Sequence, residues 1–274
     1  MNTTNNTIIA VEDADTSAGA ITYWRLSSYI DARGIIDGLA RRDIDEHAPS
    51  LPSPRTAKRR AMTKFRAGDL FVRSGPDGST LLVKQDGDEF EVVASATLNA
   101  IGQIQVETDN DELRTGIENA YVETFNSLDA RDVSRWLLNE TVECDALSLR
   151  DTGGVYFIPA HGIERWNQIA EVLRENSSCR VHTIPAMRTD DAVASILDAL
   201  TEECDAFSAA MDEALGDEDL GARAMRTRAD KADALLAKLT RYESLLGDRM
   251  ANIADQIEMQ RANAIMVALT KEGE

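Results

Sequence analysis

The chain has 274 residues, 43% hydrophobic and 5% aromatic, so it is long enough for a core built mainly from aliphatic and alanine side chains. It contains no run of about eighteen apolar residues, which excludes a membrane-spanning helix. Residues 1–15 carry no basic side chain before a short apolar patch, unlike a secretory signal. We therefore expect a cytoplasmic protein that does not bind membranes.

The net charge of −19 arises from 48 acidic and 29 basic residues. The basic residues are 23 arginines and only 6 lysines. An acid-rich, lysine-poor surface keeps a protein soluble where salt screens charge, so a halophilic source fits, and a GC-rich genome would also favour arginine. Acidity of this degree disfavours broad, nonspecific binding to nucleic acid.

The first 48 residues are predicted to form a separate strand and helix segment. Residues 7–11 and 20–26 have the composition of short strands, separated by a polar stretch. Ser27 or Ser28 is placed to cap a helix that ends near residue 40.

A basic helix follows the clearest linker of the chain, residues 47–54, which holds half of the six prolines. Ser53 followed by Pro54 predicts a helix over 54–65, because serine caps free backbone amides and proline suits the first turn. No acid occurs between Ser53 and Gly68, so the segment carries a local charge of +6. Its cations are Arg55, Lys58, Arg59, Arg60, Lys64 and Arg66.

These six cations have three possible roles. They can form a solvated face that pairs with the protein's own acids, contact nucleic acid, or contact an acidic surface of another subunit or protein. The sequence alone leaves all three open.

Residues 69–108 change from a helical period to a period of two. Four β-like runs separated by the turn sequences GPDG and DGDE predict a small antiparallel meander. DGDE lacks the further ligands of a calcium loop, so we interpret it as a hairpin turn. A helix over 109–128 and a shorter one that Asp129 caps are expected next.

The stretch after these helices predicts a compact hairpin, helix and strand unit. Asp151 to Gly154 forms a tight turn between strands 146–150 and 155–158, since two glycines permit positive φ. A helix over 162–175 and a strand over 179–184 follow. As a winged-helix wing, the hairpin would present Arg150 to DNA. The glycine pair matches no phosphate-binding motif.

The sequence LRDTGGVYFIP, together with ITYWRLSS and PSPRTAKRRA, resembles a group of uncharacterised proteins encoded by prokaryotes, their viruses and plasmids. The resemblance covers roughly residues 20–200. It implies a viral or mobile-element context and no particular chemistry.

No metal or cofactor site is expected. Asp13 and Asp15 follow a predicted strand but complete no ligand motif, so a solvated loop is the expected structure. The three cysteines form no CxxC pair and are predicted to be buried thiols, and the three histidines are scattered. These residues are Cys144, Cys179, Cys204, His47, His161 and His182.

The last part, residues 189–271, lacks proline and shows a nearly continuous helical pattern. An acidic helix capped by Thr189 is followed, after a break at 216–221, by a more basic helix over 222–269. Opposite charges favour an antiparallel hairpin of the two, with a coiled-coil-like seam.

The second helix of this hairpin is predicted to be longer than the first, so the segment from Met250 to Leu269 should be left unpaired. We expect self-association through its seam. The seam residues are Met250, Ile253, Ile257, Ala264 and Val267.

The sequence therefore predicts an α+β protein with domains over 1–48, 53–187 and 189–274. The leading functional hypothesis is a noncatalytic assembly, adaptor or scaffold protein that forms a homo-oligomer. The alternative is a nucleic-acid-binding protein that uses helix 54–66 and the 150–154 hairpin. No spacing of carboxylates singles out a general acid and base, so an enzyme is not expected.

Overall fold

The computed structural model describes residues 17–27, 29–86, 89–150, 153–217 and 219–272. It has an α+β fold with antiparallel sheets and a C-terminal helical hairpin, as the sequence predicts. The predicted strand 7–11 and the Asp13 and Asp15 pair lie outside the described residues.

The chain divides into two compact units, each made of separate stretches of sequence. The first unit comprises Met1–Trp24, Thr141–Trp166 and His182–Glu274, and the second comprises Arg25–Glu140 and Asn167–Val181. These boundaries cut across the three consecutive domains that the sequence suggests.

The first unit contains a four-stranded sheet in the order β10-β1-β9-β8. The strands are β1 (Ser17–Arg25), β8 (Leu147–Ser148), β9 (Tyr156–Pro159) and β10 (Arg180–Met187). β9 pairs antiparallel with β8 and with β1, so the predicted hairpin exists and is part of the sheet. Two residues of its turn, 151 and 152, are not among the described residues. The first and third strands along the chain are central, which is the order of a split β-α-β unit.

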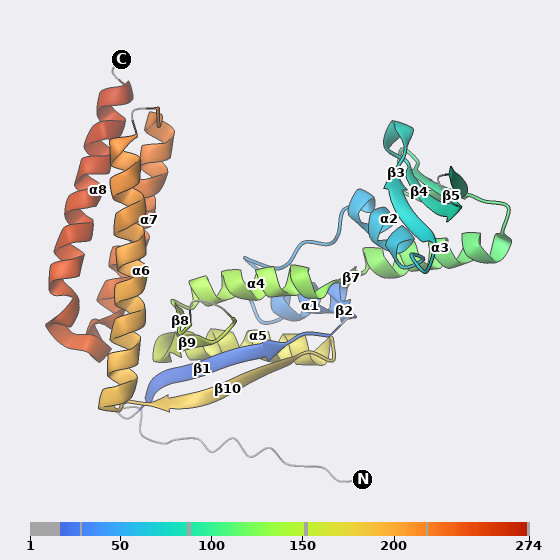
Figure 1. The fold of residues 1–274 in the computed structure, drawn as a ribbon. Helices are drawn as coiled ribbons and strands as arrows, with labels where there is room; N and C mark the ends of the chain where they lie inside the picture. Colours follow the sequence, from blue (N-terminus) through green and yellow to red (C-terminus); the bar gives the residue numbers. More distant parts are fainter. Residues whose placement is uncertain (1–16, 28, 87–88, 151–152, 218, 273–274) are drawn as a thin grey trace, which may run out of the picture. The chain divides into compact units, whose positions relative to one another are not determined.

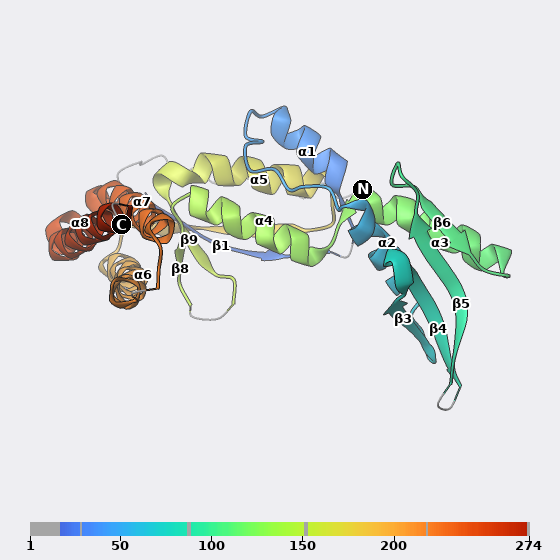
Figure 2. The same cartoon turned by 90° about the horizontal axis from the view of Figure 1, so that it is seen from above.

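The C-terminal part of the first unit is a bundle of three helices, seen from the side in Figure 1 and end-on in Figure 2. They are α6 (Asp190–Gly216), α7 (Ala222–Leu246) and α8 (Ala251–Glu272). Thr189 caps α6, as predicted, by accepting a hydrogen bond from the Ala192 amide. α7 and α8 pack against each other as a hairpin, and α6 lies against both.

The prediction of one continuous helix over 222–269 is wrong. A short 3₁₀ turn, η3 (Gly247–Met250), separates α7 from α8. Gly247 has φ +62°, a left-handed conformation that glycine adopts without a Cβ clash. The chain reverses at this residue and α8 returns along α7 (Figure 1).

This reversal covers the seam that was expected to be unpaired. Met250, Ile257 and Ala264 are buried in the bundle core, and Ile253 and Val267 pack against it half-buried. These five side chains are therefore not an open interface for a second subunit. The physical reason is that α8 packs against α7 and α6 of its own chain. This intramolecular contact already removes its apolar side chains from water, so a second subunit is not needed to bury them.

Charge pairing between α6 and α7 is also weaker than expected. Among the described residues, Glu203 and Lys238 form the only ion pair that joins them, at 2.7 Å. Arg261 and Arg226 tie α8 to α7 through Asp233 and Glu272. Ion pairs therefore link α7 to α8 more than they link α6 to α7.

The second unit contains a meander in the order β3-β4-β5-β6, which confirms the prediction for residues 69–108. Its elements are β2 (Ile30–Asp31), α1 (Ala32–Ala40), α2 (Pro54–Thr63), β3 (Leu70–Ser74), η1 (Pro76–Gly78), β4 (Thr80–Asp86), β5 (Glu89–Leu98), β6 (Ile104–Glu107), α3 (Asp111–Phe125), β7 (Ser127–Leu128) and most of α4 (Ala130–Glu143) and α5 (Ile163–Glu175).

The cap of the first helix differs from the prediction. Asp31, not Ser27 or Ser28, caps α1 by accepting hydrogen bonds from the Arg33 and Gly34 amides. The helix starts later because residues 30 and 31 pair as β2 with β7.

Candidate anion-binding site

The basic helix α2 is anchored by its small apolar face. Ser53 accepts a hydrogen bond from the Thr56 amide and Pro54 occupies the first turn, as the sequence predicts. Ala57 and Ala61 are buried against α3. Because this narrow face is turned inward, the long cationic side chains of α2 extend from the helix on two opposite sides.

On one side of α2 the cations are neutralised by the unit's own acids. Arg60 binds Asp132 through two hydrogen bonds of 2.6 and 3.0 Å, and it lies 2.9 Å from Asp129 at the start of α4. Lys64 pairs with Glu123 of α3 at 2.8 Å. Intramolecular pairing therefore accounts for these two cations, with partners from α3 and the start of α4.

The pKa of the Asp132 carboxyl is lowered in this arrangement. Burial opposes ionisation, but the hydrogen bonds and the charge of Arg60 outweigh it. The same hydrogen bonds raise the pKa of Arg60. This ion pair is a structural clamp between α2 and α4.

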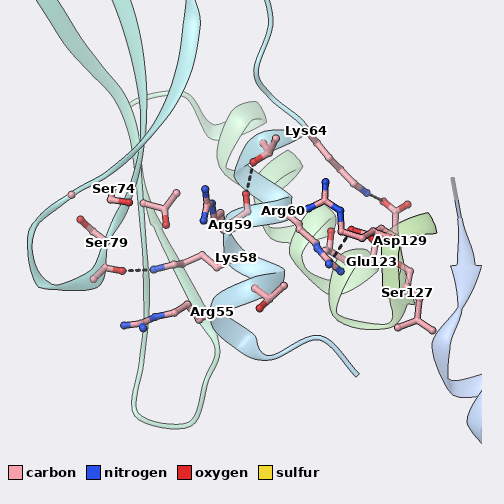
Figure 3. A pocket seen from close by; sticks show the side chains of 18 of the residues that line it. Arg55, Lys58, Arg59, Arg60, Lys64, Ser74, Ser79, Glu123, Ser127 and Asp129 are labelled. Atoms are coloured by element: carbon pink, nitrogen blue, oxygen red, sulfur yellow. Dashed lines mark hydrogen bonds and ion pairs between the residues drawn. The ribbon is translucent and has the colours of Figure 1, made fainter. Parts of the chain in front are cut away.

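The other side of α2 carries Arg55, Lys58 and Arg59, at the i, i+3 and i+4 spacing that places residues on one helix face. Figure 3 shows Lys58 and Arg55 extending toward the β3–β4 turn that bears Ser79. Within the described part of the chain, no carboxylate lies within ion-pair distance of these three cations. This side of the helix is therefore positive without compensation.

Lys58 is the most unusual of the three. Its side chain is only 3% exposed, and its Nζ donates a 2.6 Å hydrogen bond to the Gly78 carbonyl. The Arg55 guanidinium lies beside the same glycine, with Nη2 3.8 Å from where a Cβ of Gly78 would stand. Burial, and then the charge of Arg55, lower the pKa of Lys58.

These side chains line an open pocket of about 900 Å³. A sixth cation, Arg131, and a set of hydroxyl groups complete its wall, and two carboxylates, Glu123 and Asp129, lie on the neutralised side. The hydroxyls belong to Tyr29, Thr56, Thr63, Ser74, Ser79, Thr80, Thr124 and Ser127. A wall of guanidinium, ammonium and hydroxyl donors suits an anion with several oxygens.

The remaining predicted contacts lie elsewhere. Arg66 is exposed after the end of α2 and does not line the pocket. Arg150 belongs to the other compact unit, where its guanidinium lies beside Gly153. Its hairpin, β8 and β9, forms one edge of that unit's sheet, with β9 paired to β1 and β8 outermost.

The structure places the cysteines in the interior and His161 beside a carboxylate. All three cysteines are buried as free thiols, and burial raises the pKa of Cys204 to about 12, which disfavours a reactive thiolate. His161 contacts the Asp145 carboxylate at 2.9 Å. In the described ranges, no three His, Cys, Asp or Glu side chains are placed to hold a metal ion.

Several site residues were missed at the level of sequence. The sequence identifies Ser74, Gly78 and Ser79 only as turn and strand residues, and Arg131 and Tyr29 lie far from α2 in sequence. The serine-flanked and glycine-containing turn was the one local signal, because such turns bring hydroxyls and backbone groups close to a ligand.

A family model matches residues 19–272, and the chain belongs to that family, which is described as a family of unknown function (DUF6744). Neither the curated proteins nor the solved structures contain a match to the chain. Across the residues that the structure describes, no helix combines the length and apolar character needed to cross a bilayer.

Proposed function

We propose that this protein is a noncatalytic nucleic-acid-binding protein that contacts the phosphate backbone with Arg55, Lys58, Arg59 and Arg131. The observation that carries this proposal is a pocket lined by these four cations, none of them in an ion pair within the described residues, in a chain of net charge −19. The other two cations of this helix, Arg60 and Lys64, form ion pairs with carboxylates of the same unit. Cations left unpaired in so acidic a protein are best explained by an external anion.

The polar groups around these cations favour a phosphate backbone over an acidic protein surface. Arginine, lysine, serine and threonine side chains supply most protein contacts to phosphate oxygens. Tyr29, which is 51% exposed at the pocket, offers a ring on which an unpaired base can stack. The overall negative charge repels nucleic acid away from the pocket and confines the contact to it.

Fluorescence anisotropy with labelled single-stranded and duplex DNA and RNA tests this proposal. Arg55→Glu/Arg59→Glu should weaken binding by at least about tenfold and lower the slope of log K against log salt concentration by about two. Both side chains are exposed, so the variant should keep the wild-type fold. Arg60 is left intact because its replacement would break the clamp to Asp132.

The control Arg41→Glu/Arg66→Glu makes the same charge change at exposed sites of the same unit that do not line the pocket. Equal loss in both variants would indicate a diffuse charge effect and contradict a defined site. Absence of any salt-dependent binding by the wild-type chain would reject the proposal.

A second candidate is an assembly or adaptor protein of viral or mobile-element origin that self-associates through its C-terminal helices. The supporting observation is an exposed apolar stripe on the outer face of α8. Met259, Met266 and Leu269 are each about 60% exposed, and their spacing of seven and three follows one face of a helix. This stripe lies on different residues from the seam predicted by sequence.

Sedimentation over a range of protein and salt concentrations tests self-association. Met266→Lys/Leu269→Lys should convert an oligomer to a monomer, whereas the control Ala234→Lys/Ala237→Lys, at exposed positions of α7, should not. A wild-type chain that stays monomeric at high concentration would exclude this candidate.

A further inference from the structure

We propose that Lys58, Arg55 and Arg59 form a seat for one terminal phosphoryl group, a phosphomonoester, at the Gly78 end of the pocket. This inference rests on the proposed function and narrows it. Of the phosphates of a bound strand, it assigns the 5′ or 3′ terminal phosphate to this seat, and a free mononucleotide can supply the same group.

The first step of the argument is the burial of the Lys58 ammonium. An ammonium has three N–H donors, and among the described residues Nζ donates only one hydrogen bond, to the Gly78 carbonyl. Lysine is almost never as buried as this without a counter-ion, because loss of hydration disfavours the charge. Two donors therefore remain at the wall of a pocket that is open to ligands.

The second step is the convergence of like charges. The Arg55 guanidinium and the Lys58 ammonium approach the same glycine from one helix face, and the charge of Arg55 disfavours the charged form of Lys58. Folding gains nothing from two repelling cations at one point. A dianion between them turns the repulsion into two attractive contacts.

The third step concerns the shape and charge of the anion. A guanidinium presents a fork of donors and an ammonium presents a point charge, and a tetrahedral phosphoryl group with three terminal oxygens can accept from both. A phosphomonoester also carries close to two negative charges at neutral pH, with a second pKa near 6. A diester carries one charge and has only two free oxygens, so it leaves part of this donor set unused.

Gly78 provides the space for such a group. Its φ is +73°, and the position of its missing Cβ has only the Arg55 side chain nearby. A side chain at this position would stand beside the Arg55 guanidinium, next to the carbonyl that Lys58 contacts. The left-handed glycine therefore leaves the space beside Arg55 free of a side chain of its own.

Isothermal titration calorimetry of the full chain with inorganic phosphate, a nucleoside 5′-monophosphate, and matched oligonucleotides with a 5′-phosphate, a 3′-phosphate or neither tests the seat. Arg55→Gln and Lys58→Met should each weaken phosphate binding by at least about tenfold. Arg66→Gln should leave it unchanged. Binding by the wild type should strengthen as pH rises through about 6, where the monoester gains its second charge.

Arg55→Gln keeps the test valid if Lys58→Met fails to fold, because Arg55 is exposed and has no ion-pair partner within the described chain. Unchanged phosphate affinity in folded Arg55→Gln would overturn the seat. The seat would also be overturned if oligonucleotides bound equally well with and without a terminal phosphate and inorganic phosphate did not bind. This result would leave the proposed backbone contact intact. Binding of phosphate and mononucleotide without oligonucleotide binding would support the seat and reject the proposed function.

Discussion

Asp145 supports a sharp prediction about stability in the first unit, because two separate stabilising effects meet at one residue. Its backbone is left-handed, with φ +54°, and its side chain is 12% exposed. The carboxylate receives hydrogen bonds from Arg241 at 2.5 and 2.6 Å and lies 2.9 Å from His161. Its carbonyl accepts a hydrogen bond from Tyr242 of α7.

Three substitutions separate the two effects. Asp145→Asn keeps a residue that tolerates the left-handed conformation but removes the charge, which should cost about 1.5 kcal/mol because Arg241 is half exposed and water replaces part of the loss. Asp145→Gly removes the whole side chain at little backbone strain and should cost about 2 kcal/mol. Asp145→Ala adds about 1 kcal/mol of strain at positive φ, for about 3 kcal/mol in total.

Urea unfolding followed by far-UV circular dichroism measures the order of these costs. The control Asp233→Ala removes an exposed ion pair to Arg261 from ordinary helical backbone and should cost less than about 1 kcal/mol. If Ala is no worse than Gly, the left-handed backbone does not carry the assigned strain. If Asn equals the wild type, the contact to Arg241 contributes nothing to stability.

Three further predictions concern other parts of the structure. The pKa values of Asp145 and Asp132 are lowered in the folded state, because their hydrogen bonds to arginine outweigh the effect of burial. The stability that these carboxylates contribute is therefore present above the unfolded pKa near 4 and is lost as pH falls through the folded pKa values. The difference in urea midpoint between the wild type and Asp145→Asn should close in acid. Gly247→Ala should lower stability by about 1–2 kcal/mol because its φ of +62° is strained for alanine, whereas Gly216→Ala, at the helical end of α6, should not destabilise; equal effects would contradict the role of the turn. Gln260 is buried and, within the described residues, its Oε1 accepts no hydrogen bond. Gln260→Met should therefore raise the free energy of unfolding by about 1 kcal/mol. A loss of stability would show that the hydrogen bond from Gln260 to Asp212 outweighs the cost of the unsatisfied oxygen.

Local sequence signals were sufficient for most of the individual elements. The Ser53 and Pro54 pair placed the start of α2, and the period of two with intervening turns placed the meander. These signals work because a cap, a turn and a hydrophobic period depend on residues only a few positions apart.

The path of the C-terminal helices could not be read in the same way. The apolar pattern of α7 continues past Gly247 into α8, so the sequence looks like one long helix. The reversal at Gly247 is decided by the packing of Ile257 and Ala264 on the other two helices. That packing is a nonlocal gain, and it outweighs the small local preference for continuing the helix.

The sequence by itself determined the α+β composition, the acidic balance and the one basic segment at residues 54–66. Only the tertiary structure decided what that segment does, because the acids that neutralise Arg60 and Lys64 come from α3 and α4, about sixty to seventy positions away. The same folding brings Arg55 and the buried Lys58 to Gly78 with no acid among the described residues to pair them. Charge in a sequence is a sum, whereas the partner of each charge is fixed by which distant elements pack together.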